Sequence, residues 1–330
     1  MKHMLKRLVT YPALVLILAL SIPQYSLAQE EFLHRQDVQT FIDSLSQRHN
    51  IARTELEQLF KGVEIKQEII EAISKPAEGK PWHQYRPIFV TDSRADEGAE
   101  FMRANRETLQ RAEEKYGVDA AIITAIIGVE SRYGKYRGKY RVIDALATLG
   151  FNYPRRGKFF RKELEHFILL SREESLDPFS LKGSYAGAMG KAQFISSSYR
   201  EYAVDFDGDG IRDLLNNTAD AIGSVASYLA RHGWIRGELI AVPAKTDKSQ
   251  KADKKTRKPK LTIEQWQKKG VVAEVPVNQD LKMALVSLKT QNGNQYWLGS
   301  KNFYAITRYN HSPLYAMAVY QLSQSIKNKL

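Results

Sequence analysis

The 330-residue chain contains no cysteine. This absence excludes disulfides, thiolate metal sites, cysteine nucleophiles and a cysteine-borne lipid near the N-terminus. The sequence also has no P-loop, no dinucleotide-binding fingerprint and no internal repeat, and its seven histidines lack the spacing of metal ligands. Carboxylates, hydroxyls, amides and aromatic rings are left to carry any chemistry.

Long apolar runs are scarce as well. Tyr11–Leu20 is short, is interrupted by Pro12, and falls below the roughly 20 apolar residues that a membrane span needs. Basic residues precede it, and small residues follow at Ser26 and Ala28, the two positions that a signal peptidase reads. We therefore predict a cleavable signal peptide over residues 1–28 and a mature protein in the periplasm without a lipid anchor. The alternative is an uncleaved membrane anchor.

Positive charge is unevenly distributed along the chain. The formal net charge is +12; the first 28 residues supply +3, and Ala244–Lys260, with seven Lys and one Arg against two Asp, supplies +6. Subtracting both contributions leaves +3 for the rest of the chain. This distribution does not make an even basic surface, so no nucleic-acid partner is expected. The lysine-rich segment is predicted to be a solvated loop, the alternative being a contact with an anionic polymer.

Apolar residues recur mostly at helical spacing. This pattern predicts helices over residues 35–48, 54–73, 101–116, 121–134, 142–149, 159–171, 197–203, 218–232 and 313–326. Strand-length apolar segments at Met283–Leu288 and Gln295–Leu298, separated by a turn at Asn292-Gly293, predict a hairpin. The aromatic cluster Trp82–Pro87 is predicted as a loop packed on a core.

The order of these elements predicts an α+β protein that is mainly α. It divides into four parts after the signal peptide: a helical N-terminal domain (29–118), a helical core (119–236), a small β-rich insert (237–300) that carries the lysine-rich loop 244–260, and a C-terminal segment (301–330) that completes the core.

The helix that ends near Gly134 carries a candidate general acid. Asp119 is its predicted N-cap, and apolar residues at helical spacing extend the buried stripe to Glu130. Burial disfavours the charged form of a carboxyl group and keeps a general acid protonated near neutral pH. The alternative is an exposed Glu130 that pairs with Arg132 or Lys135.

The segment from Asp205 to Asp213 has the spacing of an EF-hand loop. Its alternating carboxylates and the glycine at its sixth position are what such a loop uses to wrap oxygen ligands around Ca²⁺. The twelfth position is Asn216 instead of the usual Glu, so Asp213 or Asp220 would have to close the site. The alternative is a carboxylate-rich turn without metal. The predicted ligands are Asp205, Asp207, Asp209, the carbonyl of Ile211, and Asp220.

Ordered blocks over nearly the whole mature chain resemble the peptidoglycan lytic transglycosylases of the membrane-bound B type. Singly these blocks are weak, but together they form a specific pattern. They are Gly128–Gly134 (GVESRYG), Phe151–Arg156 (FNYPRR), Lys182–Gly190, Gln193-Phe194, Asp205–Asp209, Asp220–Ala226, Arg308–Asn310 and Tyr315–Ala318.

The resemblance implies a lysozyme-like catalytic domain, a structural but not catalytic calcium ion, and cleavage of the MurNAc–GlcNAc β-1,4 bond of peptidoglycan with formation of 1,6-anhydro-MurNAc. It implies that Glu130 is the single catalytic acid and base. Glycan strands are the implied substrate of a monomer, with peptidoglycan synthases as candidate partners. The implied groove residues are Ser184, Gln193, Tyr228, Tyr309, Asn310 and Tyr315, with Tyr85 and Arg156 near the peptide side.

Two features depart from that family. Its members are typically lipoproteins, whereas this chain has no cysteine to carry a lipid, and the calcium loop is lengthened before Asp220.

The residues fit the implied chemistry on independent grounds. Ordinary glycosidases need a second carboxylate, and none is conspicuous beside Glu130; Asp144 is the nearest downstream, on a separate predicted helix. A lone acid suffices where the substrate's own N-acetyl oxygen and 6-hydroxyl act as nucleophiles. Two alternatives stay open: a muramidase that hydrolyses the same bond, and a non-catalytic, calcium-dependent glycan-binding protein.

Overall fold

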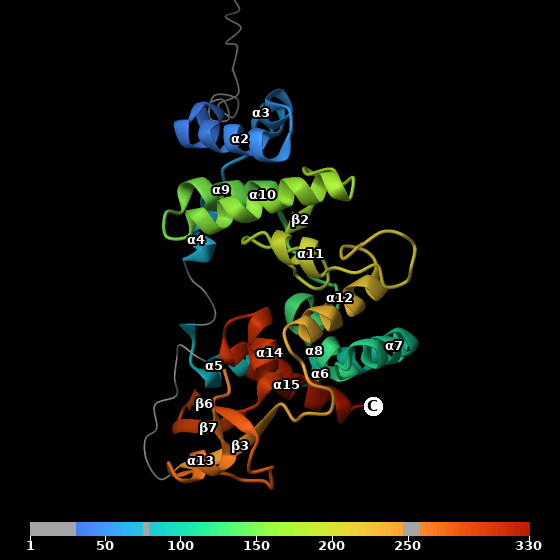
Figure 1. The fold of residues 1–330 in the computed structure, drawn as a ribbon, viewed down its shortest axis with the longest axis vertical. Coiled ribbons are helices and arrows are strands. Elements are labelled where there is room, and N and C mark those ends of the chain that lie inside the picture. The colour runs from blue at the N-terminus through green and yellow to red at the C-terminus, as the bar shows by residue number, and fades with distance from the viewer. Residues whose placement is uncertain (1–30, 75–78, 247–257) are drawn as a thin grey trace, which may run out of the picture. The chain divides into compact units, whose positions relative to one another are not determined.

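The computed structural model describes residues 31–74, 79–246 and 258–330, and the chain divides after Gly62 into two compact units (Figure 1). The predicted signal peptide and most of the lysine-rich loop lie outside the described residues. Within the described ranges, no helix combines the length and the apolar composition that crossing a membrane would require. The domain boundaries drawn from the sequence stay predictions.

The first unit contains a pair of helices, α2 (Gln36–His49) and α3 (Arg53–Lys61). Each buries one apolar face, and Phe60 of α3 is fully buried, with its ring stacked on Phe32 at 6.4 Å. Helix α2 ends at Asn50, which takes up the left-handed conformation (φ 52°) that terminates many helices.

The second unit is built mainly of helices (Figure 1). They are α4 (Gln67–Ile73), α5 (Trp82–Phe89), α6 (Asp92–Ala104), α7 (Arg106–Tyr116), α8 (Ala120–Ser131), α9 (Val142–Asn152), α10 (Gly157–Glu173), α11 (Ser196–Tyr202), α12 (Thr218–Arg231), α13 (Ile263–Gln267), α14 (Lys301–Tyr309) and α15 (Pro313–Lys327). The single helix predicted over residues 54–73 is two helices, because α3 ends at Gly62. Helix 101–116 is likewise divided, between α6 and α7 at Asn105.

The prediction of a loop at Trp82–Pro87 is wrong, because these residues form most of helix α5. Trp82, Tyr85 and Phe89 follow one another at three and four residues and lie on one face, with ring centroids 6.4 and 5.0 Å apart. Pro87 lies inside this short helix, at a place where proline removes a hydrogen bond. Burial of Trp82 and Tyr85 outweighs that loss.

Helix α8 is the centre of the second unit. It packs against α6, α7, α12 and α15, and every residue from Ala121 to Val129 is buried. A helix that is apolar all round must be surrounded by other elements. The predicted cap is confirmed, since the Asp119 carboxylate accepts from the N–H of Ala121 at 2.8 Å. The helix stops at Arg132, two residues before the predicted Gly134.

The β-rich part is a five-stranded antiparallel sheet of order β4-β6-β7-β3-β5. Figure 1 labels its strands β6, β7 and β3. The predicted hairpin is confirmed, with a turn at Gln291 and Asn292, one residue earlier than expected, because Thr290 pairs with Gly293. A separate two-stranded ribbon joins β1 to β2. The strands are β1 (Tyr140–Arg141), β2 (Lys182–Gly183), β3 (Ala241–Thr246), β4 (Leu261–Thr262), β5 (Val271–Ala273), β6 (Lys282–Thr290) and β7 (Gly293–Gly299).

Candidate active site

Glu130 lies in the last turn of α8, where the buried helix reaches a half-exposed position. The hydroxyl of Tyr315, from α15, donates to its Oε1 at 2.7 Å. The exposed alternative for Glu130 is not what the structure shows, because Arg132 and Lys135 pair with Glu97 of α6, at 2.7 and 3.3 Å. Glu130 therefore accepts a hydrogen bond from a neutral hydroxyl group, that of Tyr315.

The chain after Glu130 is fixed by main-chain geometry and by long-range hydrogen bonds. Arg132, Tyr133 and Gly134 all have positive φ angles (48°, 60° and 90°), which turns the chain sharply away from the helix. The Tyr133 hydroxyl donates to the carbonyl of Arg94 at 2.7 Å. Its ring lies against Gly128, where an added Cβ would come within 2.6 Å of ring atoms. Because these contacts fix the end of α8, they also fix the Glu130 backbone.

A groove of about 970 Å³ lies in the same unit, lined by aromatic, amide and cationic side chains. Five of the residues predicted from the sequence line it: Arg156, Gln193, Tyr228, Tyr309 and Asn310. Glu130 is not part of this lining; it is linked to the groove through Tyr315, whose ring is stacked on Tyr309 at 6.4 Å with planes 8° apart.

The tyrosines between the groove and Glu130 are held as neutral donors. Burial, and after it the charge of Glu130, raise the pKa of both Tyr309 and Tyr315 well above the usual value. Burial also raises the pKa of Tyr228, whose hydroxyl donates to the carbonyl of Arg308 at 2.5 Å. The hydroxyl of Tyr309 donates to the carbonyl of Ala192. These tyrosines therefore keep their protons at physiological pH.

Three of the predicted groove residues do not line the groove. Tyr315 lies behind it, on Glu130. Tyr85 is buried, and its electrostatic interaction with Tyr315 adds to the raised pKa of Tyr315, after burial and Glu130. Ser184 is half-buried, and its hydroxyl oxygen accepts from the N–H groups of Ala186 and Ala188 at 3.2 and 3.1 Å. Ser184 thus shapes the glycine-rich loop.

Sequence reasoning missed several cationic or titratable groups in the groove, among them His166, His232 and Arg308. The His232 ring is stacked on Tyr228 with centroids 4.0 Å apart, and burial lowers the pKa of His232. Because His232 follows Tyr228 by four residues, the helical spacing could have indicated this pair.

Asp144, the nearest carboxylate downstream of Glu130, has a structural role. It is buried and accepts from Arg141 at 2.6 and 2.9 Å and from the N–H of Glu64 at 2.9 Å. Burial raises the pKa of Asp144, and the hydrogen bonds from Arg141 oppose that rise. These contacts tie α9 to the segment before α4, so the carboxylate is committed to the fold.

The aspartate loop, residues 205–220, brings three of its predicted ligands together. Asp205, Asp207 and Asp209 each offer a carboxylate oxygen, and the three oxygens lie within 4.8 Å of one another. Gly208 and Gly210 have φ angles of 86° and 89°, and both donate N–H groups to Asp205, at 2.7 and 2.8 Å. Hydrogen bonding by the Asn217 amide lowers the pKa of Asp207. Three clustered carboxylates, which are hard oxygen donors, fit a calcium ion.

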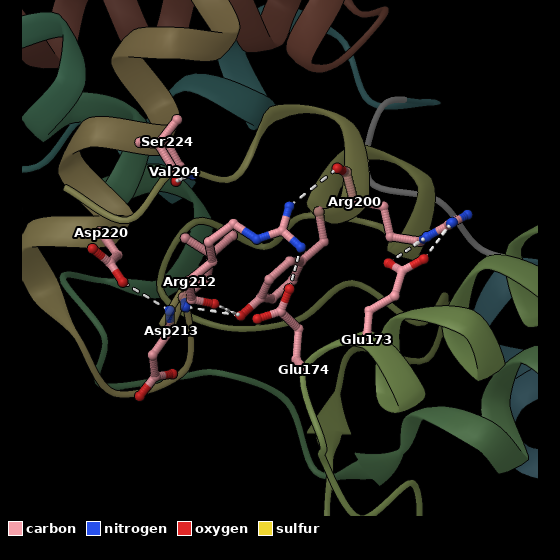
Figure 2. A network of polar contacts seen from close by, with 10 residues as sticks. Glu173, Glu174, Arg200, Val204, Arg212, Asp213, Asp220 and Ser224 are labelled. Atoms are coloured by element: carbon pink, nitrogen blue, oxygen red, sulfur yellow. Dashed lines mark hydrogen bonds and ion pairs between the residues drawn. The ribbon is translucent and has the colours of Figure 1, made fainter. Parts of the chain in front are cut away.

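Asp220 does not join that group. Its carboxylate is buried and accepts from the N–H groups of Phe206 and Asp213, both at 2.7 Å, and burial raises the pKa of Asp220. The other candidate closing ligand, Asp213, accepts from the N–H groups of Leu215 and Asn216 at 2.8 and 2.9 Å. Ile211 lies in the loop and is exposed. Figure 2 shows the Asp220–Asp213 contact.

One arginine–glutamate pair anchors this loop to the residue that follows α10, and a second pair joins the neighbouring helix α11 to α10 (Figure 2). Arg200 of α11 pairs with Glu173 at 2.6 Å, and Arg212 of the loop pairs with Glu174. Tyr199 donates to the carbonyl of Arg212 and accepts from the N–H of Leu214. The loop is thus held at its base while its three carboxylates stay accessible.

The helical fold and the half-buried glutamate at the end of its central helix define a lysozyme-like protein. The chain belongs to the family of the Transglycosylase SLT domain, which it matches over residues 33–324. The membrane-bound lytic murein transglycosylase B of Escherichia coli (strain K12) is 41% identical over 316 residues, which cover 92% of this chain and 87% of that protein. The predicted family, enzyme class and mainly helical fold are confirmed.

Solved structures agree with this assignment. The catenated lytic transglycosylase SltB1 from Pseudomonas aeruginosa has a TM-score of 0.83 at 45% identity, covering 90% of this chain and 99% of that chain. The Escherichia coli lytic transglycosylase Slt35 in complex with calcium has a TM-score of 0.83 at 42% identity, covering 90% and 95%. SltB3 from Pseudomonas aeruginosa, in complex with NAG-anhNAM-pentapeptide, has a TM-score of 0.73 at 30% identity, covering 87% and 79%.

Proposed function

We propose that this protein cleaves the MurNAc–GlcNAc bond of peptidoglycan and forms 1,6-anhydro-MurNAc, with Glu130 acting first as acid and then as base. The observation that carries the proposal is the position of Glu130 at the end of the buried helix, hydrogen-bonded by Tyr315, while Asp144 is committed to Arg141. One carboxyl group is thereby singled out for proton transfer.

Each step of the reaction needs only that group and the substrate. Protonated Glu130 donates its proton to the glycosidic oxygen, the bond from that oxygen to C1 of MurNAc breaks, and GlcNAc leaves with a new hydroxyl. The N-acetyl oxygen of MurNAc attacks C1 and holds the positive charge as an oxazolinium. Ionised Glu130 then takes the proton of the 6-hydroxyl, whose oxygen attacks C1 and releases the N-acetyl group.

The remaining residues bind and orient the sugar chain in this scheme. The aromatic rings of Tyr228 and Tyr309 offer faces to sugar rings, and the Gln193 and Asn310 amides offer hydrogen bonds to N-acetyl and hydroxyl groups. Arg156, whose guanidinium lies 4.3 Å from the Phe159 ring centroid, places a positive charge at the groove for the carboxylates of a stem peptide. The SltB3 complex with a disaccharide pentapeptide supports this class of ligand.

The test is the mass of the soluble muropeptides released from purified sacculi. Anhydro products are lighter by one water than the products of hydrolysis. We expect anhydro products from the wild type. Muropeptides with reducing ends would instead establish a muramidase, in which water replaces the 6-hydroxyl.

We propose in addition that the aspartate loop binds Ca²⁺ through Asp205, Asp207 and Asp209, with the carbonyl of Ile211 and a further carboxylate from Asp220. The Slt35 complex with calcium supports this assignment. Calcium there would neutralise clustered negative charge, and no step of bond cleavage passes through it. Asp220 would have to exchange its two main-chain hydrogen bonds for the ion.

Finally, we propose that the protein is exported as a monomer to the periplasm after removal of residues 1–28, where glycan strands are its substrate and peptidoglycan synthases are candidate partners. The sequence of the first 28 residues supports export. N-terminal sequencing that begins at Gln29 is the expected result, whereas recovery of Met1 would establish an uncleaved anchor.

A further inference from the structure

A short turn, Gly190–Phe194, lies between the aspartate loop and the groove. Gly190 has a φ of 73°, and a Cβ added there would come within 2.3 Å of the Leu214 carbonyl oxygen, so only glycine permits this approach. Gln193, also with a positive φ (48°), lines the groove and donates its Nε2 to the carbonyl of Gly190 at 2.9 Å. The turn therefore has one end against the loop and the other in the groove.

Lys191, the second residue of this turn, also contacts the end of the Glu130 helix. Its carbonyl accepts from the hydroxyl of Ser131, the residue next to Glu130, at 2.6 Å. Ser131 is buried, and its oxygen in turn accepts from the N–H of Gly134 at 3.0 Å. The side-chain stem lies beside Gly134, where an added Cβ would be 3.2 Å from the Lys191 Cγ. Both the main chain and the stem of Lys191 thus support the end of α8.

The ammonium of Lys191 reaches a different pair of elements. It donates to the carbonyl of Asn216, at the twelfth position of the aspartate loop, and to the Thr218 hydroxyl at 2.9 Å. Thr218 begins α12, the helix that carries Tyr228 into the groove and is followed directly by His232. The N–H of Lys191 donates to Leu214 at 3.0 Å. One residue therefore joins the catalytic helix, the aspartate loop and a groove-lining helix.

Holding this charge inside the protein is costly. The side chain is half-buried, and burial, followed by the charge of Arg137, lowers the pKa of Lys191, with Asp213 opposing. A buried ammonium is tolerated where its hydrogen bonds are made, and here they go to one carbonyl and one hydroxyl. These bonds have a definite direction, which an apolar contact of the same volume would lack.

We propose that Lys191 is a positioning residue for glycan cleavage. Its ammonium fixes the turn that contains Gln193 and contacts Ser131, and it thereby sets the position of Glu130 relative to the groove. The proposal rests on the proposed function for the role of Glu130. Displacement of a catalytic group by about 1 Å costs on the order of 10²-fold in rate, so a loosened turn acts on turnover more than on substrate affinity.

The experiment compares Lys191→Met with Lys191→Arg and with a matched control, Lys282→Met. Methionine keeps the stem beside Gly134 and loses the ammonium, whereas arginine restores a positive donor. Lys282 is exposed on β6, so its replacement removes the same charge away from the groove. Initial rates on soluble, uncross-linked glycan strands give kcat and KM, at a temperature well below the melting temperature of each variant.

We expect Lys191→Met to lower kcat about tenfold with KM changed less than twofold, Lys191→Arg to recover most of kcat, and Lys282→Met to match the wild type. A kcat of Lys191→Met within twofold of the wild type overturns the proposal, and so does a loss that Lys191→Arg leaves unrepaired. If Lys191→Met does not fold, Thr218→Val removes one acceptor of the same ammonium, and it should lower kcat about threefold at constant KM.

Failure of this proposal is separable from failure of the proposed function. Cleaved bonds are counted irrespective of whether the new end is anhydro or reducing, so a hydrolytic wild type would refute the anhydro product and still report on Lys191. Conversely, anhydro products from every variant at the wild-type rate would support the function and overturn the role of Lys191.

Discussion

The end of α8 and the aspartate loop both depend on carboxylates, but they place them in opposite surroundings. Glu130 is single, half-buried and hydrogen-bonded by a tyrosine whose proton is held tightly. Asp205, Asp207 and Asp209 are clustered in a loop that also contains Gly208 and Gly210, and Asp207 and Asp209 are exposed. An isolated acid beside buried groups suits proton transfer, whereas clustered exposed carboxylates suit a hard cation. The comparison predicts that one region governs turnover and the other stability.

The largest expected effect comes from Glu130→Gln. The amide keeps the shape and the hydrogen bond from Tyr315 but has no proton to give to the glycosidic oxygen. We expect the rate of sacculus solubilisation to fall by at least ~10²–10⁴-fold, with an unchanged circular dichroism spectrum. A variant that retains more than a tenth of the wild-type rate would show that another group is the acid.

The second effect belongs to the aspartate loop and to stability alone. A ligand that binds only the folded protein at about a hundredfold excess over Kd should raise the melting temperature of a domain this size by roughly 5 °C or more. Calcium is expected to do so for the wild type and not for Asp207→Ala with Asp209→Ala. Differential scanning fluorimetry, with chelator as reference, measures both.

The same double variant tests the separation of the two regions. If it loses turnover at 25 °C while still folded in chelator, the loop takes part in catalysis and the comparison fails. If calcium leaves the wild-type melting temperature unchanged, the loop is a carboxylate-rich turn without metal.

A smaller effect is expected from Tyr315→Phe. The substitution removes one hydroxyl from a buried ring and leaves Glu130 without the donor at 2.7 Å. A hydrogen bond to a charged group contributes about 1.5–3 kcal/mol. We expect part of this energy to be lost from the transition state of cleavage, which corresponds to a roughly tenfold lower kcat. Tyr309→Phe is the matched control, because its hydroxyl donates to a main-chain carbonyl and not to Glu130.

Much of this site was predictable because its signals are local. The Asp119 cap, the placement of Glu130 near the helix end and the carboxylate cluster with its glycines all follow from spacing within a few residues. The helix at Trp82–Phe89 also had a local signal, aromatic residues at three and four, which the prolines obscured.

Other parts of the site depend on contacts between distant segments, which spacing cannot show. Glu97 pairs with Arg132, and the Lys191 carbonyl accepts from Ser131. The carboxylate of Asp220, which was predicted as a metal ligand, accepts a hydrogen bond from the N–H of Phe206. Tyr85 and Ser184 have side chains that are common in sugar-binding sites. In the structure, Tyr85 lies in a buried aromatic cluster, and Ser184 accepts a hydrogen bond within a turn. Residue type alone does not separate these uses.

The smallest expected effect concerns Glu97, which forms ion pairs with Arg132 and Lys135, two cations that follow Glu130 in the sequence. Its hydrogen bonds and ion pairs with Arg132, and after them with Lys135, lower the pKa of Glu97. A carboxylate with a lowered folded-state pKa contributes stability that is fully present above its unfolded pKa and is lost as pH falls through the folded value. Glu97→Gln should therefore lower the melting temperature by a few degrees at most at pH 7, and the difference from wild type should shrink toward pH 3.

Turnover in Glu97→Gln sharpens the comparison further. Glu97→Gln would release Arg132 and Lys135 from their ion pairs at the turn that follows Glu130. We expect their positive charge to act more strongly on the Glu130 carboxylate once Glu97 no longer neutralises it. A nearby cation favours the ionised form of a carboxyl group, which is the wrong form for the first proton transfer. We therefore expect kcat at pH 7 to fall by roughly two- to threefold, with a smaller deficit at lower pH. A pH–rate profile that superimposes on that of the wild type would show that Glu97 serves only the fold.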